Sequence, residues 1–206
     1  MKIIKDVYML ESTKGNYVYL INSEEPVLID TCLPGKSKQI IKEMSDLGIS
    51  PKHIFLTHHD VDHIGNAKAL QEYTGAKLWS TKEDLPFING EKNRPGIKRI
   101  VQSIVRVEKP KVDSFFTDKQ DFLSIEVIYT PGHTPGHVCF LYKKILFVGD
   151  LLASRNGAKK LLPGFSNWNN EILKSSIEKV KLLDFDWLCP AHGEPIQRKN
   201  INDKLI

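Results

Sequence analysis

The stretch Thr57–Gly65, with the sequence THHDVDHIG, is the feature that most constrains this chain of 206 residues. It contains four side chains that can bind a metal ion, His58, Asp60, Asp62 and His63. The apolar residues just before it favour a buried strand, and helical spacing resumes after it. Two acidic groups and two histidines this close together would repel one another or lie idle without a cation. The stretch therefore predicts a metal site on a tight loop at the end of a strand.

Composition is ordinary for a folded protein and narrows the range of partners. The formal net charge is +4 and the lysines are scattered, which favours a solvated surface over a nucleic-acid site. No apolar run approaches the ~20 residues of a membrane span, and the first residues lack the core of a signal peptide. A cytoplasmic protein without a membrane partner is expected. Three separated cysteines form no CxxC pair, and two of them, Cys139 and Cys189, are interpreted as small buried hydrophobic residues.

Alternating strand and helix patterns predict one α/β domain over residues 1–206. In the first half, strands are expected at 7–10, 16–21, 27–30, 54–57 and 77–80, and helices at 36–47 and 64–73. In the second half, strands are expected at 112–116, 123–129, 138–142, 145–148 and 187–189, and a helix at 169–183. Each half has strands, a helix and a further strand, which favours two stacked sheets with helices outside.

Residues 85–111 have the least regular pattern. Prolines and glycines break the segment, and only 97–105 has helical spacing. Loops of this length are often lids or binding loops, although a plain surface excursion explains the pattern equally well. The basic residues Arg94, Lys98 and Arg99 suggest a preference for an anionic substrate.

Other polar residues also follow predicted strands. They are Asp30, His133, Asp150 and His192. Strand ends along one edge of a sheet are where α/β proteins place their sites. Taken alone, His133 or His192 has a simpler interpretation as a structural histidine, and Asp30 as a turn residue. Asp60 or Asp62 alone would be interpreted as a helix cap. The cluster at 58–63 is what favours a shared metal site.

Together these motifs resemble the metallo-β-lactamase-fold superfamily. Its main motif, T-H-x-H-x-D-H-x-G, matches Thr57–Gly65 except at Asp60. The other markers occur in order, as Asp30 in LIDT, His133 in TPGHTPGH, Asp150 in GD and His192 in CPAHG. The resemblance spans nearly the whole chain. It implies a four-layer αβ/βα sandwich with a metal site along one edge.

The resemblance also implies how the ligands would be shared between two divalent ions. His58, Asp60 and His133 would hold the first ion, and Asp62, His63 and His192 the second, with Asp150 bridging the two. A water or hydroxide between the ions would be the nucleophile. Asp62 would orient that water and later pass a proton to the leaving group. Zinc is the first expectation, with iron or manganese as alternatives.

Asp60 stands where the family usually has histidine. An anionic oxygen donor can still bind zinc, but it weakens the Lewis acidity of the ion and shifts the preference toward harder ions such as iron or manganese. A lost ligand with only one metal bound is the alternative. His59, at the variable position of the motif, is expected to point away. His137 is expected to support the site without binding metal.

The leading functional hypothesis is a metal-dependent hydrolase that cleaves an ester, thioester, lactone or phosphoester bond in a small molecule. The alternatives are an iron-dependent oxidoreductase of the same fold, acting on persulfides or oxygen, and a non-catalytic metal-binding module. The chain ends soon after His192, which leaves no room for the helical domain with which glyoxalase II-like enzymes hold a glutathione thioester. True β-lactamase action is a minority trait of the superfamily. The oligomeric state is open, with a homodimer among the alternatives.

Overall fold

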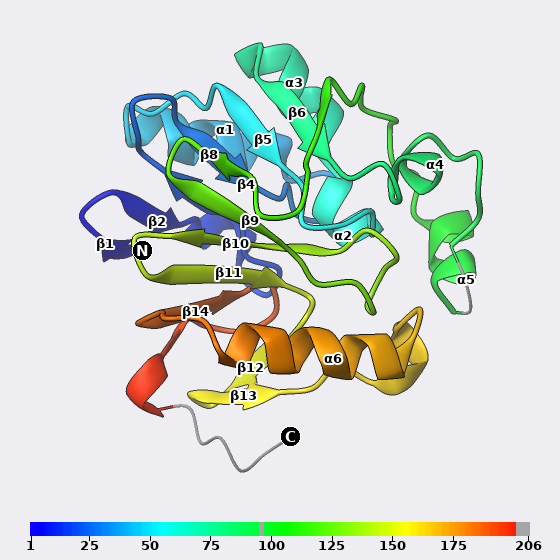
Figure 1. Ribbon diagram of the computed structural model, residues 1–206. Helices are drawn as coiled ribbons and strands as arrows, with labels where there is room; N and C mark the ends of the chain where they lie inside the picture. The colour runs from blue at the N-terminus through cyan, green and yellow to red at the C-terminus, as the bar shows by residue number, and fades with distance from the viewer. Residues whose placement is uncertain (95–96, 201–206) are drawn as a thin grey trace. The chain divides into compact units, whose positions relative to one another are not determined.

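The computed structural model describes residues 1–94 and 97–200, and the chain divides into two units. Unit 1 comprises residues 1–116, and unit 2 begins at Thr117. Each unit has one main sheet with helix packed on it (Figure 1). Within the described ranges, no helix combines the length and apolar character needed to cross a membrane. That the two units form a single domain stays a prediction.

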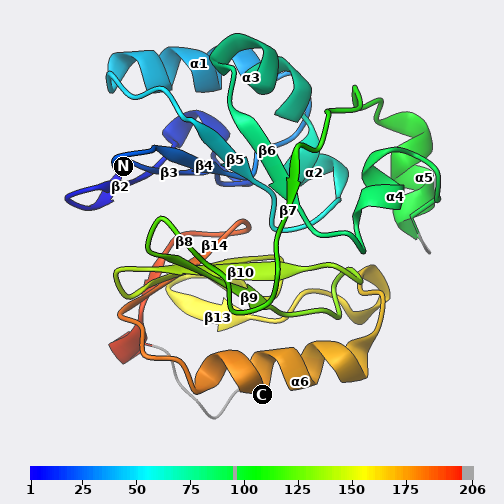
Figure 2. The ribbon, with the colours of Figure 1, turned by 45° about the horizontal axis from the view of Figure 1, so that its top comes forward.

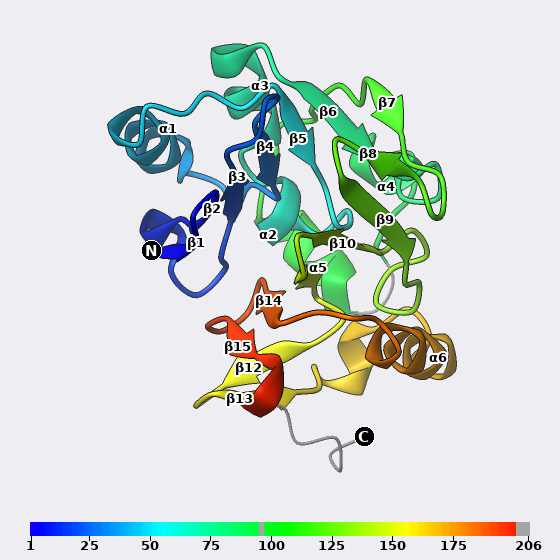
Figure 3. The same ribbon diagram turned by 60° about the vertical axis from the view of Figure 1, so that its left-hand side comes forward.

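The sheet of unit 1 brings two loops to one edge. Its strand order is β1-β2-β3-β4-β5-β6-β7, and β4 to β7 run parallel to one another (Figure 3). The strands are Lys2–Ile4, Val7–Met9, Tyr19–Ile21, Val27–Ile29, His53–Phe55, Lys77–Ser80 and Ser114–Phe115. Ile29 of β4 lies beside Phe55 of β5. Because these neighbours are parallel, the segments that begin at Asp30 and Leu56 leave the sheet at the same edge.

Helices α1 (Ser37–Asp46) and α3 (Ala67–Thr74) cover one face of this sheet (Figure 2). Ile40 of α1 and Leu70 of α3 are buried in the same cluster as Leu28 of the sheet. The shorter helices of unit 1 are η1 (Glu11–Thr13), α2 (Val61–Ile64), α4 (Leu85–Ile88) and α5 (Ile97–Ile104). The helix expected at 97–105 is therefore confirmed.

The helix expected at 64–73 is instead two helices, α2 and α3, separated at Gly65. A Cβ on Gly65 would lie 2.4 Å from the backbone nitrogen of Pro34, so only glycine fits against this loop. The side-chain amide of Asn66 donates to the carbonyl of Leu33 at 2.7 Å. The break between the two helices lets Gly65 and Asn66 contact the loop that follows β4. Helical periodicity cannot predict this long-range contact.

In unit 2, three strands end at one edge. The order of the main sheet is β15-β14-β11-β10-β9-β8, and β12 and β13 form a separate hairpin. The strands, from β8 to β15, are Asp121–Phe122, Ile125–Tyr129, Val138–Tyr142, Ile145–Gly149, Ala153–Arg155, Ala158–Lys160, Trp187–Pro190 and Ile196–Gln197. β10 is antiparallel to both β9 and β11, and β14 is parallel to β11. β9, β11 and β14 therefore point the same way.

Helix α6 (Asn170–Lys181) covers this sheet, with η2 (Gly164–Ser166) before it and η3 (Arg198–Asn200) near the end of the described chain. The Asn169 side chain caps α6 by accepting from the backbone N–H groups of the second and third residues after it, as expected for a cap. Leu173, Ile177 and Val180 of α6 are buried among residues of the sheet. The predicted helix at 169–183 is confirmed.

Two hairpins differ from the prediction. The strand expected at 123–129 is β9 (Ile125–Tyr129), but its first two expected residues, Leu123 and Ser124, form the turn of a hairpin with β8 and have φ values of 58° and 62°. Such turns usually carry Asn-Gly, so the sequence gives no signal there. The β12–β13 hairpin was not predicted, although its turn, at Asn156 and Gly157, has that signal.

Candidate metal centre

Asp30, directly after β4, holds the loop that follows β5. Its carboxylate accepts hydrogen bonds from the Thr57 backbone N–H at 2.8 Å, the Thr57 hydroxyl at 2.7 Å and His63 Nδ1 at 2.8 Å. The residue is buried and has a φ of 60°, a left-handed conformation in which aspartate is enriched. Because a carboxylate only accepts, His63 Nδ1 carries the proton and its Nε2 has a lone pair.

The hydrogen-bonded pair of Asp30 and Thr57 also orients His58. Its Nδ1 lies 3.0 Å from Thr57 Oγ1, whose own proton goes to Asp30. His58 Nδ1 is therefore the donor, and Nε2 again has the lone pair. Metal-binding histidines almost always donate their other ring nitrogen in this way, which fixes the tautomer and the ring direction. Both imidazoles of the loop are thus in the form that binds a cation.

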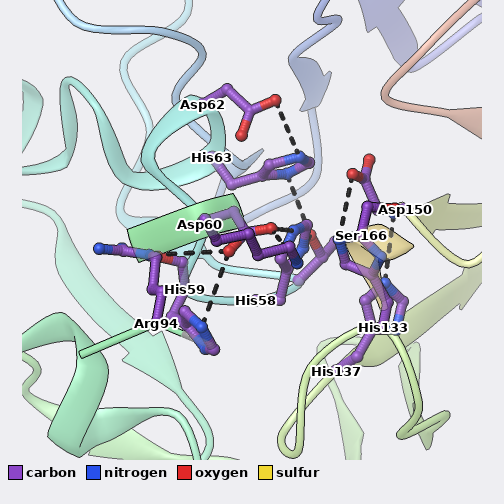
Figure 4. Close-up of polar contacts among 12 residues, drawn as sticks. His58, His59, Asp60, Asp62, His63, Arg94, His133, His137, Asp150 and Ser166 are labelled. Carbon is purple, nitrogen blue, oxygen red and sulfur yellow. Dashed lines mark hydrogen bonds and ion pairs between the residues drawn. The ribbon is translucent and has the colours of Figure 1, made fainter. Parts of the chain in front are cut away.

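Each of these imidazoles has a carboxylate beside its Nε2 atom (Figure 4). The distance from His58 Nε2 to Asp60 Oδ2 is 3.5 Å, and that from His63 Nε2 to Asp62 Oδ2 is 3.9 Å. Asn16 donates its side-chain amide to Asp62 Oδ2 at 3.2 Å. Asp60 occupies the N-cap position of α2, but its side chain makes no capping hydrogen bond. The simpler interpretation of Asp60 as a helix cap is therefore wrong.

Asp60 is also paired with two cations from the 85–111 segment. Lys98 Nζ lies 2.5 Å from Asp60 Oδ2, and Arg94 Nε lies 3.6 Å from Oδ1. Arg94 is only 4% exposed and also donates to the backbone carbonyl of His59. Burial lowers the pKa of the Arg94 guanidinium, and the charge of Asp60 opposes that shift. Arg99, the third basic residue of the pattern, is exposed.

His59 packs mainly beside α4, although its Nε2 atom also lies 3.7 Å from Asp60 Oδ1. Its ring stacks on Phe87 with centroids 4.3 Å apart, and its Nδ1 lies 3.0 Å from Asp84 Oδ2. The same carboxylate oxygen accepts from the His59 backbone N–H at 3.0 Å. The histidine at the variable position of the motif is therefore buried against α4 and the residue before it.

In unit 2, Asp150 lies between two histidines. Its Oδ2 is 3.3 Å from His133 Nε2, and its Oδ1 is 3.3 Å from His192 Nε2. These three residues follow β9, β11 and β14, the strands that end at one edge of the sheet. A carboxylate that turns one oxygen toward each of two imidazoles has the arrangement of a bridging ligand.

Two further polar side chains orient this set. His133 Nδ1 lies 2.9 Å from Asn167 Oδ1, which again leaves Nε2 as the lone-pair atom. His137 Nε2 accepts from the Asp150 backbone N–H at 3.3 Å, and its Nδ1 lies 2.8 Å from Thr130 Oγ1. His137 holds the backbone of Asp150, in agreement with the supporting role expected from the sequence.

Glycine allows the close approaches that place these loops. Gly132, before His133, has a φ of 135°, and a Cβ there would lie 2.3 Å from the Cα of Leu173 in α6. Gly193, after His192, has a φ of 99°, and a Cβ there would lie 2.0 Å from the carbonyl oxygen of Ser154. Neither position has room for any other residue, so both histidine loops depend on glycine.

A family model described as the metallo-β-lactamase superfamily matches residues 13–192. The chain belongs to this superfamily. It is 27% identical to a hydroxyacylglutathione hydrolase of Pelagibacter ubique, over 98% of this chain and 82% of that protein. It is 29% identical to the hydroxyacylglutathione hydrolase GloC of Haemophilus influenzae, over 72% of this chain and 70% of that protein.

Solved structures of the superfamily share the fold. The subclass B3 metallo-β-lactamase BJP-1 of Bradyrhizobium japonicum aligns with a TM-score of 0.76 at 23% identity, covering 93% of this chain and 76% of that one. TTHA1623 in a di-iron-bound form aligns with a TM-score of 0.71 at 24% identity, covering 88% and 89%. The predicted metallo-β-lactamase fold is confirmed.

The donor chemistry of each unit fits divalent ions. Two ligands placed about 2.1 Å from one ion at a tetrahedral angle are about 3.4 Å apart. In the four pairs that involve an Nε2 atom, the distance from nitrogen to carboxylate oxygen is 3.3–3.9 Å. In three of these four histidines, Nδ1 is hydrogen-bonded to an oxygen atom. Sequence reasoning missed Asn16, Asn167 and the pairing of Asp60 with Lys98. Each depends on a tertiary contact that no local pattern encodes.

Proposed function

We propose that this member of the superfamily is a metal-dependent hydrolase that acts on a small-molecule ester or thioester. The observation that supports the proposal is the set of four imidazole–carboxylate pairs, two in each unit, at strand ends. Hydroxyls, carboxylates and amides already hold three of the imidazoles from behind. Such a pre-oriented donor set is what metal catalysis needs and a structural role does not require.

The family resemblance implies that the chain would hold two ions. His58, Asp60 and His133 would hold the first ion. Asp62, His63 and His192 would hold the second, and Asp150 would bridge the two. When bound, such ions polarise the substrate carbonyl or phosphoryl oxygen and lower the pKa of water to about 7. Zinc suits the mixed nitrogen and oxygen donors and is the ion we propose.

Asp62 is the residue of this chain that would move the proton. Its side chain is 23% exposed, whereas that of Asp60 is 9% exposed, so Asp62 is open to water. The Asn16 amide holds its Oδ2 atom. We propose that the Asp62 carboxylate accepts a proton from the attacking water as the new carbon–oxygen bond forms. It then gives that proton to the leaving thiolate or alkoxide as the old bond breaks.

The substrate class is proposed from the relatives. Two curated proteins, 27% and 29% identical, are hydroxyacylglutathione hydrolases, and a hydroxyacylglutathione is a thioester. Both relatives support the metallo-hydrolase class predicted from the sequence. A thioester is also a chemically consistent choice, because a thiolate leaves readily once the carbonyl carbon has been attacked.

The test is hydrolysis by purified, zinc-loaded protein of a panel made of a glutathione thioester, an aryl ester, a lactone and an aryl phosphodiester. We expect the thioester to be cleaved, and chelation to abolish turnover reversibly. Asp62→Asn should lower kcat by ~100-fold or more even when enough zinc is supplied to load the variant fully. Asp46→Asn, a matched change on the exposed face of α1, should have no effect. A loaded protein that cleaves nothing in the panel would refute the proposal.

The carboxylate-rich donor set also suits iron, which keeps an oxidoreductase as the second candidate. Elemental analysis of protein grown without added metal separates the two. Stoichiometric zinc supports the hydrolase, and stoichiometric iron with persulfide or oxygen turnover supports the oxidoreductase. Zinc content with no turnover of any kind would favour the third alternative, a non-catalytic metal-binding module.

A further inference from the structure

Each carboxylate oxygen of Asp60 forms an ion pair with a basic side chain. Lys98 Nζ contacts Oδ2 at 2.5 Å, and Arg94 Nε is 3.6 Å from Oδ1. The Lys98 side chain is 13% exposed and that of Arg94 is 4% exposed, so little water screens either charge. All three residues lie in unit 1.

The oxygen that Lys98 contacts is the one that a first metal ion would need. Asp60 Oδ2 faces His58 Nε2 at 3.5 Å, and that imidazole atom has the lone pair. An ion held by His58 and Asp60 would therefore bind the oxygen that already accepts from the Lys98 ammonium. A carboxylate oxygen has two lone pairs and can accept both, but two like charges would then meet at one atom.

The second imidazole–carboxylate pair of the same loop has a different neighbour. Asp62 Oδ2 accepts from the neutral amide of Asn16 at 3.2 Å, and it faces His63 Nε2. A neutral donor orients the carboxylate without opposing a cation. The two halves of one motif are thus in different electrostatic surroundings, although their ligand chemistry is the same.

We propose that Lys98 is a specificity-determining residue of the metal centre, an internal cation that weakens the position of the first ion. The inference rests on the two-ion site of the proposed function. The protein then fills in two steps, first with a tightly bound ion at Asp62 and His63, and later with a weaker ion at His58 and Asp60. Arg94, buried beside the other oxygen, keeps the Asp60 carboxylate in place when Lys98 is displaced.

The test is metal binding by chelator-stripped protein, measured by zinc titration against a chromophoric chelator, with elemental analysis after gel filtration. Lys98→Met is compared with Lys92→Met, the same change at an exposed lysine of the same segment. We expect wild type to bind the ion at Asp60 at least ~10-fold more weakly than the ion at Asp62. In Lys98→Met, the ion at Asp60 should bind ~10-fold or more tightly than in wild type, with the affinity of the ion at Asp62 and the apoprotein Tm unchanged. Lys92→Met should behave as wild type.

A gain of affinity is the informative sign, because a merely structural lysine would lower affinity when removed. In the Asp60→His background, which removes the carboxylate that Lys98 contacts, the gain from Lys98→Met should shrink to less than ~3-fold. Unchanged or weaker binding of the ion at Asp60 in Lys98→Met would overturn the inference, as would an equal gain in Lys92→Met or the binding of only one ion by both proteins. Turnover measured on the same samples keeps this result distinct from the proposed function. Thioester cleavage with no effect of Lys98→Met refutes the inference alone.

Discussion

The three hydrogen bonds to the buried carboxylate of Asp30 predict a large stability loss in Asp30→Asn. Asparagine keeps the shape of the side chain and tolerates the left-handed backbone at a φ of 60°, so the change alters only the polar contacts. One carboxylate oxygen becomes an amide that can only donate. The amide group can replace either oxygen, and the orientation that loses fewer hydrogen bonds places it opposite the Thr57 backbone N–H. In the wild type, that N–H donates a hydrogen bond to Asp30 at 2.8 Å.

The magnitude follows from one lost charge-assisted hydrogen bond and one buried donor left facing another. A hydrogen bond to a charged group contributes about 1.5–3 kcal/mol, and an unsatisfied buried donor costs about 1–3 kcal/mol. Because the two costs partly describe the same lost contact, they do not simply add, and we expect a loss of about 2–4 kcal/mol in the free energy of unfolding. For a protein of this size, that loss corresponds to a Tm about 5–15 °C lower.

The assay is urea unfolding of metal-free protein followed by circular dichroism, so that bound ions add no stability. Asp46→Asn is the matched control, since the Asp46 carboxylate is exposed and forms an ion pair with Lys42, one turn earlier in α1. That surface pair should contribute less than about 0.5 kcal/mol. An Asp30→Asn variant within 0.5 kcal/mol of this control would show that Asp30 does not hold the metal-binding loop.

Three other predictions test separate parts of the structure. Gly132→Ala should destabilise by about 3 kcal/mol or more, because its Cβ would overlap Leu173, whereas Gly157→Ala, at a φ of 75° in open space, should cost only about 1–2 kcal/mol; the two urea midpoints decide this. Asn167→Ala should weaken zinc binding by ~10-fold or more, since it releases Nδ1 of a proposed ligand; unchanged zinc affinity would contradict that role. Burial raises the pKa of Cys139 to about 12 and also raises the pKa of the other two thiols, so a thiol reagent at pH 8 should label native protein slowly and label all three cysteines once it is unfolded; rapid labelling of the native state would contradict the burial.

Much of the fold could be predicted, because apolar periodicity is a local signal that the tertiary structure rarely overrides. β6 (Lys77–Ser80) and β10 (Val138–Tyr142) have the bounds expected from the sequence, and α6 differs by only one or two residues at its ends. The misses have specific causes. The helix break at Gly65 depends on the backbone of Pro34, and the β8–β9 turn uses residues without turn chemistry.

The candidate ligands could be named from the sequence, but the groups that orient them could not. A motif indicates which side chains follow a strand. Because β4 and β5 are parallel neighbours, Asp30 then lies beside Thr57. Asn16 and Asn167 carry no motif, since an amide that supports a ligand resembles any other surface amide in sequence. The burial of Cys139 and Cys189 was predicted correctly, because it follows from apolar neighbours alone.

Asp60 shows why one residue that differs from a family pattern cannot be interpreted from its own chemistry. By itself, replacing an imidazole with a carboxylate adds a negative charge. That charge should strengthen the attraction for a metal ion and weaken the Lewis acidity of the bound ion. Arg94 and Lys98, more than thirty residues further along the chain, add two positive charges to the same carboxylate. Counted by themselves, Asp60, Arg94 and Lys98 carry one net positive charge. The attraction that the Asp60 carboxylate alone would exert on a cation is therefore opposed by its two basic partners, and the comparison of Lys98→Met with Lys92→Met measures how far Lys98 offsets it.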